Sequence, residues 1–581
     1  MEIPDSRDYR LVIGIDFGTT YSGIAWAEPS KRDRATPIRN WPRNRTGIGG
    51  ESSPKVPTKL RYLNNKEFEW GFQIPGDAPP QEVLSLFKLG LEPTKFRRSV
   101  DVIGKSLDSE DLDQKITDYL TGLFEHFESA VKKQIGTNTL RYRPVQFVLT
   151  VPAIWGERAK QRTAEAFERV PNLPRDHSTT LISEPEAAAA AALQELDRHD
   201  LKVGESFVIV DAGGGTVDLI TYTITSLDPI LEVVEATGGT GDFCGASRVN
   251  DRFIQFIASR LGHEEGWNEE ILRDAVDHFE AMTKRTFNIN SLTNNESFGI
   301  PVQGLNTNID LGISRPGRLS LRAEDVHMFF EPDIIRIIQL VKEQIAMANV
   351  PIRKVLLVGG YGSSMYLLER LRMAVREDSS IGKDTEVLQP PDPWLTVVRG
   401  AVMKGLSMIN PVIYDVPMVK ARAGRKHYGY KIGKVWDEDK HQSLRSRRFY
   451  DGLRGLWRVS VMYWIIRKGE LVSENDPFLR TYTQSQPVAR GRLRTLKIEV
   501  YADETSATAP LAQNNNVQLL CVVTANLEHI PEHQLTKKLG VDGQMHYDEE
   551  FEIEAVYRSA STSYTLIHKG RRYDTVTAEY V

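Results

Sequence analysis

The sequence contains only two cysteines, Cys244 and Cys521, among its 581 residues. Two cysteines cannot form a disulfide framework or a four-cysteine zinc site. Such scarcity is typical of proteins from a reducing compartment. We therefore expect a cytoplasmic protein.

Long apolar runs and an excess of basic residues are also missing. No stretch of about 18 apolar residues occurs, which predicts no membrane insertion. Residues 1–10 are polar and carry charges of both signs, unlike the basic and then apolar start of a signal peptide. The 73 Lys and Arg residues are outnumbered by 78 Asp and Glu residues, for a formal net charge of −5. A nucleic-acid binder usually has a basic surface, so we expect no nucleic-acid partner.

Two segments of the chain share one pattern, an apolar strand followed by Asp, a spacer, Gly and Thr. In the first, residues 11–15 precede Asp16, and in the second, residues 207–210 precede Asp211, which is 211 − 16 = 195 residues later. A second strand-like segment follows each turn, so each unit predicts a β-hairpin with a glycine-bearing tip. The repeat divides the first part of the chain into two similar lobes. The tips consist of Gly18, Thr19 and Thr20 in the first unit, and of Gly213, Gly214, Gly215 and Thr216 in the second.

These hairpins have the chemistry of a phosphate site. A glycine-rich turn lets backbone amides approach a phosphate closely, and successive amides form a concave anion site. A carboxylate at the strand end, Asp16 or Asp211, suits Mg²⁺, often through water. For one copy, an ordinary tight turn is the favoured alternative. Two copies in matching context instead predict a clamp that grips a polyphosphate and its metal from both sides.

A third strand, residues 355–358, runs into Gly359 and Gly360. These glycines would let the backbone lie against a flat base or a ribose. The next residue, Tyr361, could either stack on that base or cap the core.

Elsewhere, strands alternate with helical patterns at residues 112–135, 325–348 and 367–376, which indicates the α/β class. Beyond Asn410 the pattern changes to period-two alternation, which predicts a β-rich domain at residues 411–581. A basic cluster in this domain, Arg445 to Arg448 with Arg454 and Arg458, favours a solvated face or a protected sheet edge over an anionic ligand site.

Together, the motifs resemble the actin-like ATPase superfamily and, within it, the nucleotide-binding domain of the heat shock protein 70 (DnaK-type) family. The residues within these motifs are most similar to those of the divergent heat-shock-70-like branch of filamentous fungi. The matching segments lie in the family's order within about residues 11–405: Ile13–Ser22, Thr150–Ala153, Ile182–Ala189, Asp211–Asp218 and Val358–Gly360.

The resemblance implies a bilobed actin-like ATPase (ribonuclease H-like) domain. It places lobe I at residues 1–200, lobe II at 201–390, and a helix returning to lobe I with a linker at 391–410. The β-rich domain at 411–581 then has no helical lid, because no long helical segment follows it in the sequence.

The resemblance also implies roles for individual residues. Asp16 and Asp211 would hold Mg²⁺. Glu184 and Asp218 would lie near the attacking water, Lys88 would be the catalytic lysine, and Thr19 would contact the γ-phosphate. A surface charge is the alternative for Lys88. The expected nucleotide-binding residues are Gly18, Thr19, Thr20, Tyr21, Gly213, Gly214, Gly215, Thr216, Glu280, Lys284, Arg285, Gly359, Gly360 and Tyr361.

Among these, Glu280, Lys284 and Arg285 would lie against adenosine. Glu280 and Lys284 are four residues apart and share a helix face, so an exposed ion pair is their alternative.

The expected ligands are therefore ATP or ADP and Mg²⁺, and the expected activity is slow hydrolysis of ATP to ADP and phosphate. The nucleotide state would gate a reduced C-terminal domain that binds unfolded or client segments, as in a chaperone. A nucleotide-gated scaffold or sensor with little turnover is one alternative, and a small-molecule kinase is another. The sequence names no client, exchange factor or J-domain partner.

Overall fold

The structure is a computed structural model of the whole chain, in which residues 10–29, 35–43, 50–64, 67–92, 109–136, 143–195, 201–573 and 576–581 are described. Residues 1–9, where the sequence predicts no signal peptide, lie outside this part. The chain forms two compact units, Met1–Met418 and Val419–Val581. The division lies close to the predicted start of the C-terminal domain at residue 411. The finer lobe boundaries stay a prediction.

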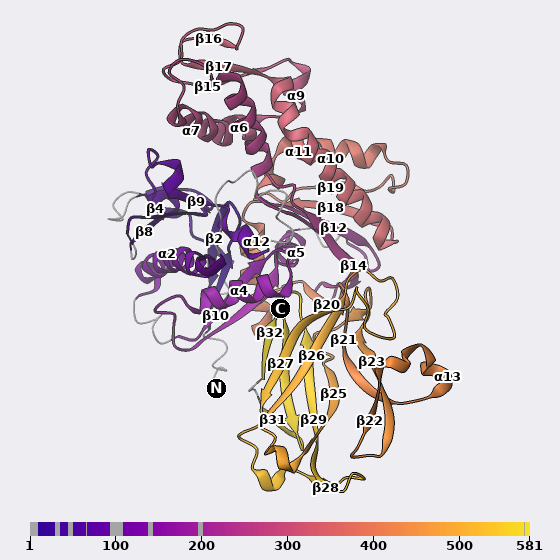
Figure 1. Cartoon of the computed structure of the whole chain (residues 1–581). Helices are drawn as coiled ribbons and strands as arrows, with labels where there is room; N and C mark the ends of the chain where they lie inside the picture. The colour runs from indigo at the N-terminus through magenta and orange to yellow at the C-terminus, as the bar shows by residue number, and fades with distance from the viewer. Residues whose placement is uncertain are drawn as a thin grey trace. The chain divides into compact units, whose positions relative to one another are not determined.

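Two sheets with the same strand order form the centre of the first unit (Figure 1). We call the strands β11-β10-β1-β2-β3 with their helices lobe I, and the strands β19-β18-β12-β13-β14 with their helices lobe II. The lobe I strands are β1 (Leu11–Asp16), β2 (Tyr21–Ala27), β3 (Thr36–Pro37), β10 (Val145–Val151) and β11 (His177–Ser183), and β6 (Val56–Pro57) pairs with β2. The lobe II strands are β12 (Ser206–Ala212), β13 (Val217–Ser226), β14 (Glu232–Asp242), β18 (Ile352–Val358) and β19 (Glu386–Leu388).

The two predicted hairpins are β1–β2 and β12–β13, and their registers are equivalent. Each first strand runs antiparallel to its hairpin partner and parallel to the strand on its other side. Asp16 lies beside Thr150 of β10, whereas Asp211 lies beside Val358 of β18. The sequence repeat therefore corresponds to a repeated topology.

Helices α5 (Glu184–Gln194) and α12 (Thr396–Ile409) pack against each other where the lobes meet. Ser183 caps α5, because its hydroxyl accepts a hydrogen bond from the Glu186 amide. A Cβ on Gly400 of α12 would collide with the backbone of Ala187 in α5, so glycine permits this close approach. Helix α12 also lies on lobe I, since a Cβ on Gly14 of β1 would come within 2.8 Å of a backbone atom of α12.

Apolar side chains bury the faces of these sheets. The predicted helix at 112–135 is α2, whose stripe of Ile116, Leu120 and Leu123 is buried in the lobe I core. The predicted helix at 325–348 is α10, which packs in the lobe II core through residues such as Ile337. The helices of the first unit are α2 (Ser109–Ile135), α4 (Glu157–Glu168), α5 (Glu184–Gln194), α6 (Ser247–Leu261), α7 (Glu269–His278), α8 (Lys284–Thr286), α9 (Ile289–Thr293), α10 (Ala323–Ala348), α11 (Met365–Glu377) and α12 (Thr396–Ile409).

In the described part of this unit there are three smaller sheets. Their strands are β4 (Asn40–Pro42) and β5 (Gly50–Ser52); β7 (Lys59–Tyr62), β8 (Phe68–Trp70) and β9 (Val83–Ser85); and β15 (Ser297–Pro301), β16 (Ile313–Arg315) and β17 (Arg318–Arg322).

The second unit is β-rich, with one sheet ordered β22-β23-β21-β26-β27-β32 and another ordered β25-β29-β30-β31. Alternate residues such as Leu496, Phe551 and Leu566 fill the core. Its strands are β20 (Met418–Ala423), β21 (His427–Val435), β22 (Arg448–Asp451), β23 (Leu456–Ile466), β24 (Leu471–Val472), β25 (Phe478–Pro487), β26 (Thr495–Asp503), β27 (Gln518–Asn526), β28 (Lys537–Leu539), β29 (Met545–Tyr557), β30 (Thr562–His568), β31 (Arg571–Tyr573) and β32 (Val576–Tyr580), and its described α-helix is α13 (Glu438–His441). The predicted fold class is therefore confirmed: an α/β, bilobed, actin-like unit is followed by a β-rich one.

The basic cluster of the second unit lies at a sheet edge. Strand β22 is the terminal strand of its sheet. The Arg448 guanidinium lies 4.2 Å from the ring centroid of Trp457, and Arg454 and Arg458 both pair with Asp451. These contacts fit the surface interpretation of the cluster.

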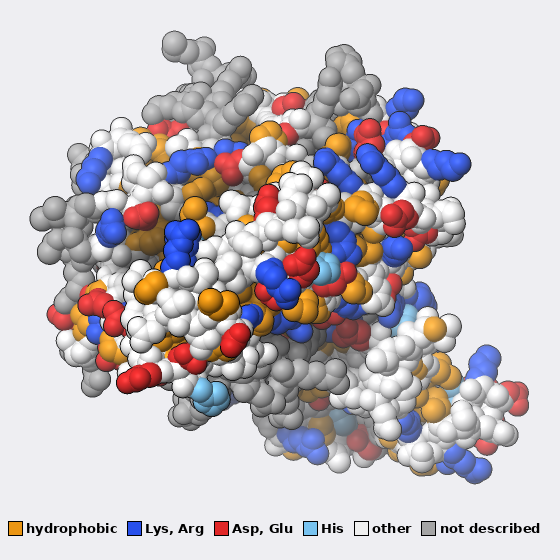
Figure 2. Space-filling view, turned by 90° about the horizontal axis from the view of Figure 1, so that it is seen from above, with side chains coloured by type: hydrophobic (Ala, Val, Ile, Leu, Met, Phe, Trp, Pro, Cys, Tyr) orange, Lys and Arg blue, Asp and Glu red, His pale blue; other side chains and the backbone are white. Residues whose placement is uncertain are grey.

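Charges of both signs are mixed over the face of the molecule shown in Figure 2. Among the described residues, no helix is long and apolar enough to cross a membrane.

Candidate functional site

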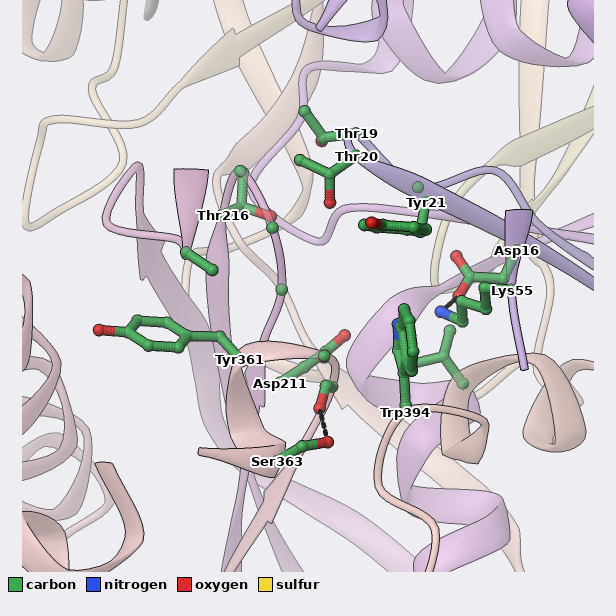
Figure 3. Close-up of a pocket in the computed structure, with 18 of the residues that line it drawn as sticks. Asp16, Thr19, Thr20, Tyr21, Lys55, Asp211, Thr216, Tyr361, Ser363 and Trp394 are labelled. Atoms are coloured by element: carbon green, nitrogen blue, oxygen red, sulfur yellow. Dashed lines mark hydrogen bonds and ion pairs between the residues drawn. The ribbon is translucent and has the colours of Figure 1, made fainter. Parts of the chain in front are cut away.

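The tips of the two hairpins meet across a cavity of about 350 Å³. A Cβ on Gly214 would collide with the Thr20 side chain, and one on Gly215 would lie 2.8 Å from the Thr19 Cγ2 atom. In Figure 3, Thr19 and Thr20 face Thr216 across the top of the cavity. The cavity is lined by Asp16, Gly18, Thr19, Thr20, Tyr21, Lys55, Glu184, Asp211, Gly213, Gly214, Gly215, Thr216, Ala246, Glu280, Lys284, Arg285, Gly359, Gly360, Tyr361, Ser363, Ser364, Trp394 and Val397.

Asp16, at the end of β1, has both carboxylate oxygens engaged. The Thr150 hydroxyl donates to Oδ1 over 3.1 Å, and the Lys55 ammonium group forms a short ion pair with Oδ2. Asp16 and Lys55 are 4% and 6% exposed, so this ion pair is shielded from water. Figure 3 shows the pair at the side of the cavity.

Asp211, at the equivalent place in lobe II, has a different environment. Its carboxylate forms no hydrogen bond or ion pair with the described part of the chain. Burial raises its pKa well above the ordinary value, and the nearby carboxylates of Glu184, Asp218 and Asp16 raise it further. Gly359 approaches this carboxylate closely at φ +90°, where a Cβ would collide with Oδ1. Among the described residues, Asp211 is therefore a buried carboxylate without a direct hydrogen-bond or ion-pair partner, and the Lys55 charge only partly opposes its raised pKa.

Glu184, the first residue of α5, forms an ion pair with Lys88. Lys88 Nζ lies 2.9 Å from Glu184 Oε1, and the lysine is 1% exposed. The ammonium group also lies 5.4 Å from the ring centroid of Phe17 and 4.9 Å from that of Trp155, in a cation–π environment. The structure thus places Lys88 inside the protein and not on its surface.

The surroundings of Glu184 bring its titration close to neutral pH. Burial raises the pKa of Glu184 to about 7, although the Lys88 charge opposes this shift. The negative charges of Asp16 and Asp218 raise the pKa as well. A carboxylate with this pKa can accept or release a proton near pH 7.

Asp218 lies near Glu184 but does not line the cavity. Its Oδ1 atom accepts a hydrogen bond of 3.1 Å from the Ile154 amide. Its buried Oδ2 atom has no hydrogen-bond partner at normal geometry among the described residues. Burial raises the pKa of Asp218, while hydrogen bonds from Ile154 and Thr216 oppose that shift.

The cavity lining also contains a second charged group. Lys284 Nζ lies 3.0 Å from Glu280 Oε2 and donates to Asn250 Oδ1 over 2.9 Å, while the Asn250 amide donates to Glu280. Burial would raise the pKa of Glu280, but the Lys284 charge and the Asn250 hydrogen bond hold it below the ordinary value. Glu280 lies in a single π-helical turn, Phe279–Thr283, a feature often found at functional sites.

Aromatic side chains adjoin this charged group. The Arg285 guanidinium lies 5.4 Å from the ring centroid of Trp394, and the rings of Tyr21 and Trp394 meet edge to face at 5.2 Å. Burial raises the pKa of Tyr21 to about 12, and Glu280 contributes to that shift. Tyr21 is therefore neutral at physiological pH.

Most of the predicted site residues line this one cavity, but three are placed differently. Lys88 and Asp218 lie behind the lining. Tyr361 lines the cavity, yet its ring points away from it in Figure 3 and packs 6.2 Å from the ring centroid of Phe330 in the lobe II core. Of the two roles considered for Tyr361, the structure favours capping of the core.

Sequence reasoning missed several lining residues. Lys55 follows Pro54 in a segment without a recognisable motif, and its buried position depends on the pairing of β6 with β2. Trp394 carried one usable signal, because it follows the turn-forming run Pro390–Pro393 just before α12. The other missed residues are Ala246, Ser363, Ser364 and Val397.

The donor set fits Mg²⁺ unequally in the two lobes. Asp211 offers a buried carboxylate with no hydrogen-bond or ion-pair partner among the described residues, the type of oxygen ligand that Mg²⁺ accepts together with water and phosphate oxygens. Asp16 already has partners on both oxygens. Among the described residues, no group of three or more His, Cys, Asp or Glu side chains is arranged to hold a metal by itself.

Comparison with known proteins finds related sequences over most of the chain. No protein-family model matches it. It is 24% identical to heat shock 70 kDa protein 12A of Mus musculus, over 84% of this chain and 81% of that protein. It is also 24% identical to heat shock 70 kDa protein 12B of Homo sapiens, over 87% of this chain and 83% of that protein. A chaperone protein HscA homolog of Rickettsia rickettsii is 22% identical, over 74% of this chain and 64% of that protein.

Over most of its length the chain is thus similar to heat shock 70 kDa proteins, as a divergent, heat-shock-70-like sequence.

Proposed function

We propose that this chain binds ATP and ADP in the cavity between the two hairpins and hydrolyses ATP slowly, as a chaperone-type protein. The observation that carries the proposal is the convergence of Asp16, Asp211 and the Glu184–Lys88 pair on one cavity beneath two touching glycine tips. The names of the relatives, heat shock 70 kDa proteins and a chaperone homolog, support the same class.

Each end of the cavity suits one part of a nucleotide. The glycine tips present backbone amides without a Cβ, and the hydroxyls of Thr19, Thr20 and Thr216 add hydrogen-bond donors for phosphate oxygens. At the other end, Trp394 with Arg285 and the backbone of Gly360 form a surface for a flat base. The Glu280–Lys284 pair adds polar groups that can contact the ribose or the base.

Hydrolysis of ATP requires a positioned water and neutralisation of the phosphate charge. Glu184, with a pKa of about 7, is the proton acceptor, and the negative charge of Asp218 behind it helps to raise that pKa. Lys88 keeps Glu184 in place and contributes positive charge. When bound, Mg²⁺ would add Lewis acidity, and Asp211 is the carboxylate that would hold it.

The same geometry supports a nucleotide-dependent switch. The two tips belong to different lobes, so a polyphosphate held by both would link the lobes in one arrangement. We propose that this arrangement regulates the C-terminal unit, that this unit binds unfolded or client segments, and that the protein works in the cytoplasm. Assignment to the fungal heat-shock-70-like branch also belongs to this proposal.

Two alternatives make different predictions. In a nucleotide-gated scaffold or sensor, the cavity binds ATP with hardly any turnover. In a small-molecule kinase, the γ-phosphate passes to an acceptor molecule. The retained acidic group around Glu184 favours hydrolysis over the sensor.

The test measures ATP binding and phosphate release by the wild type, with and without an unfolded peptide and candidate sugars. Glu184→Gln should lower phosphate release by about 100-fold or more while ATP still binds, because removal of a catalytic base has an effect of this order. Glu386→Gln, at an exposed carboxylate outside the cavity, is the matched control and should behave like the wild type. Binding with turnover that Glu184→Gln does not change would favour the sensor, and sugar-dependent ADP release would favour the kinase.

A further inference from the structure

Lys55 occupies a place in lobe I that an acidic residue occupies in lobe II. In the β1–β2 hairpin, Asp16 lies opposite Gly23, and in the β12–β13 hairpin, Asp211 lies opposite Asp218. Gly23 has no side chain, and the stem of Lys55 fills that space. A Cβ on Gly23 would lie 3.3 Å from Lys55 Cγ and 3.4 Å from Lys55 Cε. Beside its strand-end aspartate, the lobe I hairpin thus has a cation, Lys55, whereas the lobe II hairpin has a carboxylate, Asp218.

The segment that bears Lys55 is fixed to the tip of the lobe I hairpin. Strand β6 begins at the next residue and pairs with Tyr21 and Ser22 of β2. Thr58 donates from its amide to the Thr20 carbonyl over 2.8 Å and from its hydroxyl to the Gly18 carbonyl over 2.8 Å. Because these bonds hold both sides of the tip, the Lys55 ammonium group stays at the phosphate end of the cavity.

The charges at this end require cations. Four carboxylates, those of Asp16, Asp211, Asp218 and Glu184, interact here, as the raised pKa values of Glu184 and Asp211 show. Lys88 is committed to Glu184, at 2.9 Å. Lys55 is the additional cation among the residues that line this end, and it lies directly on the carboxylate that the family pattern assigns to Mg²⁺.

We propose that Lys55 serves as a built-in cation at the phosphate end of the cavity, so that this chain binds nucleotide with little dependence on Mg²⁺. Lys55 neutralises Asp16 and can donate to the β- or γ-phosphate oxygens, a role that a divalent metal would otherwise fill. Any bound Mg²⁺ is then held from the lobe II side, at Asp211. This inference rests on the proposed nucleotide site.

The test compares ADP and ATP binding to the full-length wild type in excess Mg²⁺ and in EDTA, by isothermal titration calorimetry. We expect the dissociation constant to change by less than about tenfold, since one charge-assisted contact contributes about that factor. A larger loss of wild-type affinity in EDTA would overturn the inference.

The variant Lys55→Met removes the charge and keeps a long apolar stem over Gly23. We expect its affinity in EDTA to fall by about tenfold or more relative to the wild type, and Mg²⁺ to restore most of that loss. Lys354→Met is the matched control, because Lys354 is also largely buried and paired, with Glu386, but lies outside the cavity. An equal Mg²⁺ dependence in Lys55→Met and in the wild type would contradict the role of Lys55.

These outcomes separate the two proposals. If the wild type binds no nucleotide in either condition, the proposed function itself fails. If the wild type binds nucleotide in Mg²⁺ but that binding is lost in EDTA, only the inference about Lys55 fails. The wild-type comparison decides the inference even if Lys55→Met does not fold.

Discussion

The hairpins of lobe I and lobe II have the same topology but give their aspartates opposite surroundings. Asp16 contacts the Thr150 hydroxyl and the Lys55 ammonium group. In lobe II, Val358 replaces the hydroxyl-bearing neighbour in register, and Asp211 has no hydrogen-bond or ion-pair partner in the described part of the chain. Equivalent positions of the duplicated fold therefore hold one carboxylate with partners on both oxygens, Asp16, and one that is available to a ligand, Asp211.

Within one cavity, this difference links Asp16 to the stability of the fold and Asp211 to the binding of ligands. A buried ion pair resists the loss of either partner, because the remaining charge stays buried without compensation. A buried carboxylate without a partner instead destabilises the free protein and favours binding of a cation or a proton. We thus expect lobe I to fix the shape of the site and lobe II to respond to its ligands.

The largest expected effect is the loss of the Asp16 carboxylate. Asp16→Asn leaves the Lys55 charge buried without a partner, so we expect the free energy of unfolding to fall by about 3 kcal/mol. Chemical denaturation of the nucleotide-free protein measures this change. Unchanged stability would show that the Lys55–Asp16 pair is not an important contact in the folded protein.

The contact between the tips is expected to have the next largest effect. In Gly214→Ala the new Cβ would overlap the Thr20 side chain, so the tips must separate, and we expect nucleotide affinity to fall by about tenfold. Gly238→Ala is the matched control, since a Cβ there meets nothing within 4 Å. Equal nucleotide affinities of the two variants would argue against a site between the tips.

A smaller effect of opposite sign is expected at Asp211. Its pKa is raised in the folded protein, so its protonation favours folding at low pH, and stability is lost as the pH rises through the folded-state pKa. Asp211→Asn should therefore be more stable than the wild type by about 1 kcal/mol at neutral pH without metal. The difference should disappear toward the ordinary pKa of aspartate, and denaturation over a pH series tests this. A variant less stable than the wild type at neutral pH would mean that Asp211 has a stabilising partner.

The smallest expected effect concerns the part of the cavity that Trp394 and Arg285 line. Trp394→Leu keeps an apolar side chain but removes the cation–π contact with Arg285, so we expect ATP affinity to fall by about threefold. Inorganic triphosphate should bind both proteins equally, because it lacks the base. A loss of triphosphate affinity as large as that of ATP would place Trp394 at the phosphate end instead.

Sequence patterns predicted much of this arrangement. The repeated Asp–x–Gly turns, each followed by threonine, depend on local sequence, and the structure brings both to one cavity. Lys88 was placed from its order along the chain, but its contact with Glu184, 96 residues away, depends on tertiary packing. Alternation along residues 493–500 and 551–557 was sufficient to predict the second unit as β-rich.

The asymmetry between the lobes could not be predicted from these patterns. Lys55 reaches Asp16 because β6 pairs with β2 and because Gly23 leaves space for its stem. Neither condition produces a local signal, since a lone lysine after a proline is usually a surface residue. The inward direction of the Tyr361 ring likewise follows from the packing of the lobe II core.

Titration of ATP into the full-length protein with Mg²⁺ tests the central claim most directly. The account predicts one saturable site per chain in the wild type, with affinity that falls in Gly214→Ala and is retained in Gly238→Ala. Absence of saturable binding to the folded wild type would contradict it.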